Sequence, residues 1–358
     1  MSRNLTTLCV ATTLLGGTAL ADVPTVATDI APVHALVARV MDGVGTPTLI
    51  LPPGASPHEY SLRPSEAAAL QDADLVFWMG ADLAPWMEDA VATLATNARV
   101  TTLLDAEETT LLPFREGALF EAHDHDHGDE EHDHASHDHD HDHDHAEHDH
   151  AHDHDHDHDH THDSSEKAAS HDHAHDDHDH ETHAGHDHGE HDPHAWLSPQ
   201  NAAAWLTLIA TQLSTADPDN AATYFTNATE GRTELDALSA EVAEILAPAR
   251  GGSFIVFHDA YQYFETAFDF PASGAISLSD ATDPSPARIA EIRDRVRDEG
   301  ITCVLAEPQF NAGLVDTVLD GTEARTGVID PIGIDLTPGP DLYPQLIRNM
   351  ATTLAGCL

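Results

Sequence analysis

One segment of unusual composition divides this chain. Residues 121–192 hold 27 of its 31 histidines, and most of them alternate with aspartate. The segment has almost no apolar side chains, so it cannot bury enough surface to offset the entropy of ordering, and we predict a disordered His/Asp-rich insertion. Imidazole and carboxylate groups at this density bind borderline divalent cations such as Zn²⁺ loosely. The segment therefore predicts a protein that handles metal ions.

The N-terminus has the features of a secretory signal peptide. Arg3 supplies a short positive region, residues 5–20 are uncharged and apolar or small, and residues 19–21 form an A-x-A cleavage pattern. The apolar run is too short and too rich in Thr and Gly to span a membrane, and no other stretch approaches the required length. We expect removal of residues 1–21 and export of the mature chain as a soluble protein.

Two cysteines remain after that cleavage, Cys303 and Cys357. An even pair in an oxidising compartment favours a disulfide, with two separate buried thiols as the alternative. A bridge would join the C-terminal tail to an internal strand and contribute about 3–4 kcal/mol to stability.

The formal net charge of −50 is not explained by the insertion alone. The insertion holds 27 of the 64 acidic residues and one of the 14 basic residues, so the remaining residues still carry a charge of −24. Such an acidic surface argues against nucleic acid or an anionic membrane as a partner and favours cations. Adaptation to a salty habitat would produce the same composition.

Outside the insertion, short apolar runs rich in β-branched residues alternate with helical patterns. The predicted strands are residues 25–30, 48–51, 74–79, 99–104, 253–257, 275–278, 301–305 and 326–329. The predicted helices between them are residues 33–41, 65–71, 86–93, 261–268, 286–297, 314–323 and 343–354. This alternation predicts the α/β class with parallel sheets.

A longer helical pattern lies between the two halves. Asp217 is the expected N-cap, Pro218 suits the first helical position, and Pro248 with the glycines after it ends the pattern. A helix of this length spans roughly 40 Å and suits a rigid strut. The expected organisation is a signal peptide (1–21), an N-terminal α/β lobe (22–216) containing the insertion (121–192), a linking helix (217–248) and a C-terminal α/β lobe (249–358).

Three histidines and one aspartate outside the insertion lie in connecting segments, mostly just after predicted strands, where α/β folds place ligands. Two of them, His58 and His194, belong to the first lobe, whereas His258 and Asp330 belong to the second. A cation between the lobes would then meet three imidazoles and either a carboxylate or a water, a four-coordinate zinc site. For each residue alone a structural hydrogen bond is the ordinary alternative, but their joint placement favours ligand roles.

Two further residues receive different predictions. His34 lies within the helical stretch 33–41, and we predict a packing or surface role for it. Glu307 follows the strand 301–305 and is expected either to orient a histidine or to accept a purely structural hydrogen bond.

Four motifs follow one another along the chain. They are Gly-Ala-Ser-Pro-His-Glu-Tyr-Ser-Leu-Arg-Pro-Ser-Glu (54–66), Asp-Pro-His-Ala-Trp-Leu-Ser-Pro (192–199), Phe-His-Asp-Ala-Tyr-Gln-Tyr-Phe (257–264) and Ala-Glu-Pro-Gln-Phe (306–310). Together they resemble the motifs of ZnuA-type zinc-binding proteins, the periplasmic components of zinc ABC importers. The resemblance covers essentially the whole mature chain. It implies two (β/α)₄-type lobes with parallel sheets, bridged by a single long helix, with the metal at their interface.

The resemblance also implies individual roles. The zinc ligands would be His58, His194 and His258, and the two cysteines would form the family's C-terminal disulfide. The counterpart of Asp330 is a ligand in manganese-type relatives, whereas a water or a neighbouring carboxylate fills that place in zinc-type relatives. Some relatives carry the carboxylate just before the first histidine, but here Glu59 follows it, so Asp330, Glu59 and water all stay open as the fourth ligand.

The expected function is that of a monomeric periplasmic solute-binding protein. It would capture Zn²⁺ and deliver it to an inner-membrane ABC permease, without chemistry on a substrate. Three imidazoles suit zinc, whereas oxygen-richer ligand sets suit manganese. A free-standing periplasmic zinc buffer or chaperone that acts through the insertion is the alternative. A zinc hydrolase would need a general base, such as Glu59 or Glu307, but no nucleophile motif supports it.

Overall fold

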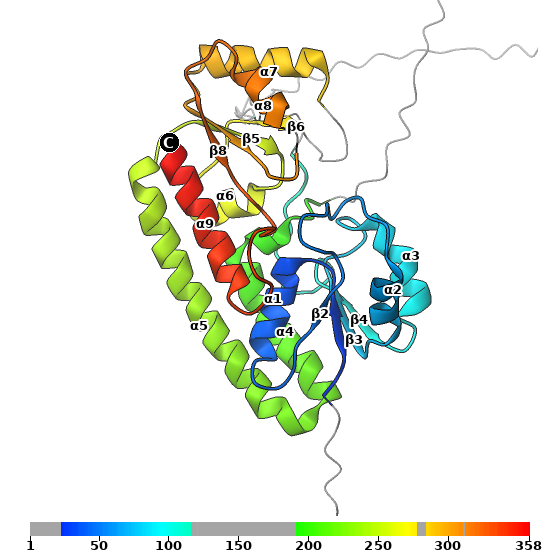
Figure 1. Cartoon of the computed structure of the whole chain (residues 1–358). Helices are drawn as coiled ribbons and strands as arrows, with labels where there is room; N and C mark the ends of the chain where they lie inside the picture. The colour runs from blue at the N-terminus through cyan, green and yellow to red at the C-terminus, as the bar shows by residue number, and fades with distance from the viewer. Residues whose placement is uncertain (1–22, 116–119, 121–190, 278–283, 311) are drawn as a thin grey trace, which may run out of the picture. The chain divides into compact units, whose positions relative to one another are not determined.

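The computed structural model describes residues 23–115, 120, 191–277, 284–310 and 312–358 (Figure 1). The predicted signal peptide and nearly all of the predicted insertion fall outside these ranges. The predicted strands and helices in the described part of the chain are all present, with ends that differ from the predictions by a few residues.

The first half of the chain forms a parallel sheet with the strand order β2-β1-β3-β4. Its strands are β1 (Val26–Thr28), β2 (Thr48–Leu49), β3 (Leu75–Trp78) and β4 (Arg99–Thr102). The helices between them are α1 (Ala31–Val40), α2 (Pro64–Gln71) and α3 (Pro85–Leu94). Successive side chains of a strand point to opposite faces. Phe77 accordingly lies in the core that includes α1, whereas Val76 packs with α2 and α3.

The second half repeats this architecture with the strand order β6-β5-β7-β8. The strands are β5 (Phe254–His258), β6 (Ala275–Ser277), β7 (Cys303–Ala306) and β8 (Arg325–Val328). The helices are α6 (Gln262–Phe268), α7 (Pro286–Asp298), α8 (Ala312–Leu319) and α9 (Leu342–Cys357). On β7, Val304 packs with α7 and α8, whereas Leu305 shares a core with α9. The predicted α/β fold with two (β/α)₄-type halves is confirmed.

Two helices occupy the middle of the described chain. Helix α4 (Pro199–Ala216) begins after Ser198, whose hydroxyl accepts a hydrogen bond from the Asn201 amide at 3.2 Å. Helix α5 (Ala221–Leu246) packs against α4 and α1 of the first half and against α9 of the second half (Figure 1). It therefore connects the two halves of the chain.

The N-terminal cap predicted for the long helix is wrong. Asp217 stands before a separate 3-10 turn (Pro218–Asn220), and α5 begins after that turn. The Asp217 carboxylate accepts hydrogen bonds from the side chains of Asn220 and Tyr224, at 2.7 and 2.8 Å. Both bonds end on Oδ2, and Oδ1 accepts no hydrogen bond from the described residues, so no backbone amide is capped by this carboxylate.

Cys303 of β7 and Cys357 at the end of α9 form a disulfide, as predicted. The bond fastens the last helix to a central strand of the second sheet. No helix in the described ranges is long and apolar enough to cross a membrane.

Candidate metal centre

His58 lies in the loop that leads from β2 to α2. The loop is held by the first half of the chain, because Trp86 of α3 donates its indole N–H to the carbonyl of Pro57 at 2.7 Å. The Tyr60 hydroxyl also donates to the Glu66 carboxylate of α2, at 2.9 Å. The His58 side chain is half-buried.

His194 lies just before the 3-10 turn Ala195–Leu197 that leads into α4, and it is buried. Its Nδ1 atom is 2.7 Å from Oδ1 of Asp192, which also accepts the His194 backbone N–H at 2.9 Å. A carboxylate oxygen accepts, so Nδ1 carries the proton and Nε2 keeps its lone pair. Nε2 is buried and has no hydrogen-bond partner among the described residues.

Burial sets the charge of this pair. It raises the pKa of Asp192 to about 7, and it lowers the pKa of His194 well below its ordinary value, with a further contribution from the nearby His258. The His194 ring is therefore neutral at neutral pH. It can bind a cation without first losing a proton.

His258 is the last residue of β5, whereas the sequence predicted that it would directly follow the strand. Its Nδ1 atom lies 2.6 Å from Oε1 of Glu307, which follows β7 and is buried. Of the two roles left open for Glu307, the geometry favours the one that orients a histidine. His194 and His258 thus share one arrangement, in which a buried carboxylate accepts a hydrogen bond from Nδ1. The same arrangement commonly orients imidazoles that bind metal ions through their other nitrogen.

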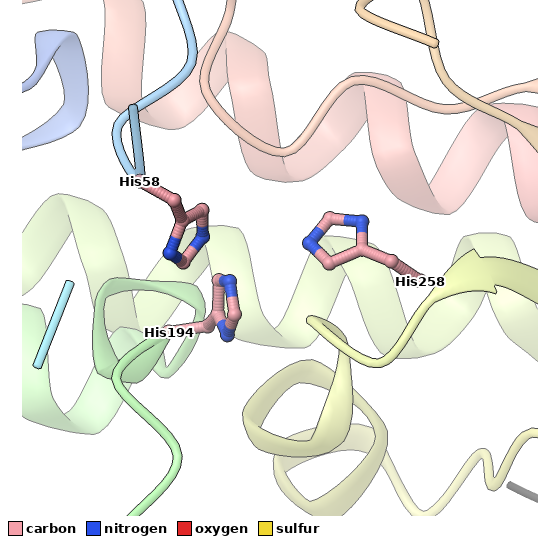
Figure 2. A group of neighbouring side chains, drawn as sticks. All are labelled: His58, His194 and His258. Atoms are coloured by element: carbon pink, nitrogen blue, oxygen red, sulfur yellow. The ribbon is translucent and has the colours of Figure 1, made fainter. Parts of the chain in front are cut away.

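The three histidines converge on one point (Figure 2). The centroid of the His194 ring lies 5.4 Å from that of the His58 ring and 5.3 Å from that of the His258 ring. One nitrogen from each ring lies within 4.8 Å of the other two. Zinc with Zn–N bonds of about 2 Å holds its nitrogens about 3.4 Å apart, so a small inward movement of the rings would complete the site.

The rings line a small pocket together with the side chains of both sheets' connecting segments. Its cavity volume of about 20 Å³ holds one water-sized species. Pockets for organic substrates measure about 300–1,000 Å³. The pocket therefore suits an ion and its remaining water ligand.

Asp330 is not among the residues brought together. Its carboxylate accepts backbone N–H groups from Ile332, Gly333 and Ile334, at 3.1, 2.8 and 2.7 Å. In the described part of the chain, the group of side chains close enough together to hold a metal ion consists of the three histidines alone. Glu59 is exposed and is also outside that cluster. His34 packs within α1 as predicted, with Nε2 3.1 Å from the carbonyl of Pro47.

The sequence prediction assigned no role to Asp192, although Asp192 orients His194. The available indication was its position two residues before a histidine, from which an aspartate can accept both the backbone N–H and the ring N–H. The sequence prediction also gave no role to Trp196. Its ring centroid lies 5.2 Å from that of His194, and its indole N–H donates a hydrogen bond to the carbonyl of Pro331 at 2.8 Å.

Two parallel α/β halves that bring histidines to one ion-sized pocket define the class of metal-binding solute-binding proteins. Comparison with known proteins specifies the family. The family ZnuA, "Zinc-uptake complex component A periplasmic", matches residues 26–357. The chain belongs to the ZnuA family, as its motifs indicated.

The relatives agree along nearly the full length. The high-affinity zinc uptake system protein ZnuA of Brucella abortus (strain 2308) is 46% identical over 333 residues, which cover 93% of this chain and 91% of that protein. The protein of the same description from Paracoccus denitrificans (strain Pd 1222) is 41% identical over 341 residues, covering 95% and 93%. A crystal structure of ZnuA shares the fold, with a TM-score of 0.66 at 19% identity over 94% of this chain and 99% of that chain.

Proposed function

We propose that this chain captures Zn²⁺ with His58, His194 and His258 in the periplasm and delivers it to an inner-membrane ABC permease. The chain is a ZnuA-type zinc-binding protein of a zinc import system, and the proposal adds the ligands and the partner. The observation that carries it is the convergence of three imidazole nitrogens within 4.8 Å. Two of the rings are already fixed by buried carboxylates, so the ion meets a largely prepared site.

The ligand set favours zinc over harder cations. Three neutral imidazoles suit zinc, whereas manganese prefers more oxygen ligands. Both carboxylate oxygens of Asp330 already accept hydrogen bonds, from three backbone amides in all. A water is therefore the fourth ligand that we favour. The bound zinc ion is the cargo of the protein. A pocket of this size is too small for a hydrolase substrate.

Loss of ligands tests the site. In the full mature chain, His58→Ala, His194→Ala and His258→Ala should each weaken tight zinc binding about tenfold or more, because each removes one of three strong ligands. Trp196 reports on the pocket, since its ring contacts His194. The chain contains four tryptophans, none of them in the insertion, so tryptophan fluorescence during competition with a chelator follows the folded part of the chain and not the insertion.

His34→Ala is the matched control. It removes an imidazole that is as buried as His194 and His258 but lies outside the cluster. Equal zinc affinity in wild type and in any one of the three ligand variants would remove that residue from the site.

Delivery is tested in cells. Uptake of radioactive zinc at low external concentration should require both this protein and the permease, and loss of either should abolish it. Uptake that persists without the permease would contradict delivery. It would favour the alternative, a free-standing periplasmic zinc buffer.

A further inference from the structure

Arg115 forms a buried ion-pair cluster close to the histidines. Its guanidinium contacts the carboxylates of Asp259 and Glu265, and its Nη1 donates to Glu265 at 2.7 Å. The side chains of Asp259 and Glu265 are only 7% and 5% exposed, and that of Arg115 is 16% exposed. Asp259 directly follows His258, and Glu265 lies on α6, so one arginine from the first half of the chain holds the segment after His258.

A second connection runs beside it through Tyr263 of α6. The Tyr263 hydroxyl donates to the carbonyl of Asp192 at 2.8 Å and accepts the amide N–H of Leu112 at 3.0 Å. The Asp192 amide in turn donates to the Leu112 carbonyl at 2.9 Å. Asp192 is also the residue that orients His194. Residues 112–115 and 191–194 are thus joined by hydrogen bonds to the segment that carries His258.

His58 is supported differently. The hydrogen bonds from Trp86 and Tyr60 connect its loop with α2 and α3 of the first half. The bonds around Arg115 and Tyr263 instead connect the supports of His194 and His258 with each other. Two of the three ring positions are thereby coupled.

We propose that Arg115 is a positioning residue of the metal centre, which fixes the spacing of His194 and His258 by clamping the β5–α6 segment against the segment before the insertion. It does not contact the metal. Its planar fork serves two buried carboxylates at once, which the single ammonium of lysine cannot do with the same geometry. The inference rests on the proposed ligand roles of these histidines. It adds the contacts that keep their two rings at a fixed distance from each other.

The test compares Arg115→Lys with Arg39→Lys in the full mature chain. Lysine keeps a positive charge beside the buried carboxylates, so the fold is retained, but the fork is lost. Arg39 is the matched control because its side chain is 15% exposed, close to the 16% of Arg115, and contacts two acidic side chains outside the pocket, Glu230 and Glu234. Zinc release into excess EDTA is followed by tryptophan fluorescence. Cobalt absorption at one equivalent reports on the ligand geometry.

Arg115→Lys should release zinc about tenfold faster, at the lower end of what loss of support behind a metal ligand costs, and should alter the cobalt d–d bands. Arg39→Lys should match wild type in both measurements. Wild-type release and an unchanged cobalt spectrum in Arg115→Lys would overturn the inference. Equal acceleration in both variants would also overturn it.

Tyr263→Phe gives a second, independent measurement if Arg115→Lys fails to fold. It keeps the ring in the core and removes only the hydroxyl that joins Leu112 and Asp192. Zinc release should again be faster, and a wild-type rate would overturn the inference. Failure of the proposed function has a different result: wild type itself would then show no tight zinc site that depends on His58.

Discussion

The Nδ1 atom of His258 lies 2.6 Å from Oε1 of Glu307, so the ring donates a hydrogen bond to a buried carboxylate while its opposite edge faces the other two histidines (Figure 2). Asp192 does the same for His194. Two buried carboxylates therefore set the ring orientation of two of the three proposed ligands.

The first prediction concerns Glu307. Glu307→Ala should weaken zinc binding about 10- to 100-fold, because the His258 ring loses the acceptor that fixes its tautomer and orientation. Glu307→Gln should recover part of this loss, since it retains a carbonyl oxygen that accepts from Nδ1. Chelator competition monitored by tryptophan fluorescence measures both. Wild-type affinity in Glu307→Ala would show that the contact is only structural.

The second prediction separates ligation from structure at Asp330. Asp330→Ala should lower the free energy of unfolding of the zinc-free protein by about 2–3 kcal/mol, because three backbone amides lose their acceptor. Its effect on zinc affinity should be smaller than that of the histidine variants. Urea unfolding in EDTA and zinc competition measure the two quantities. An affinity loss as large as that of His258→Ala, with stability unchanged, would make Asp330 a ligand.

The third prediction is a pH dependence at Asp29, which follows β1. Its carboxylate accepts the amides of Ile30 and Met79, at 2.7 and 2.6 Å, and burial raises its pKa to about 7. Since the folded pKa exceeds the unfolded one, the native state binds the extra proton between about pH 4 and pH 7. Protonation of Asp29 therefore stabilises the fold as pH falls through 7.

Asp29→Asn removes this titration. The stability of wild type relative to that variant should rise by about 2–3 kcal/mol between pH 7.5 and pH 5, in urea unfolding with EDTA present. Titration of the histidine-rich insertion is common to both proteins and cancels in the difference. A difference that does not change with pH would mean that Asp29 has an ordinary pKa.

The fourth prediction concerns the insertion. Deletion of residues 123–186 should remove several weak zinc sites and leave one tight site, because a chain that each ion must order binds with lower affinity. The deletion leaves Arg115, His191 and Asp192 in place. Calorimetry of the deleted and full-length proteins gives the number and affinity of the sites. Loss of tight binding on deletion would favour the buffer function over the pocket.

The sequence predicts the sheets and the histidines because both depend on local order. The run Phe254–Phe257 is apolar and β-branched enough to identify a buried strand, and a histidine at its carboxyl end must then face the edge where ligands bind. Helix α4 has an equally local start at Ser198 and Pro199.

The supports of the site could not be predicted in the same way. Arg115 and Asp259 are 144 residues apart, and Tyr263 is 71 residues from Asp192. Local periodicity says nothing about which of many acidic side chains an arginine will meet. The N-cap predicted at Asp217 is wrong for a different reason: residues 218–220 form a separate 3-10 turn, and α5 begins only after it.

Pro113 and His191 form an isolated antiparallel β-bridge, which bears on how the length of the insertion can evolve. The described residues on either side of residues 121–190 are thus already adjacent, so neither sheet depends on how many residues lie between them. For a segment as poor in apolar residues as 121–192, doubling its length costs only about 0.6 kcal/mol of closure entropy. We therefore expect repeats of His-Asp to be gained or lost by mutation with little penalty to the two sheets.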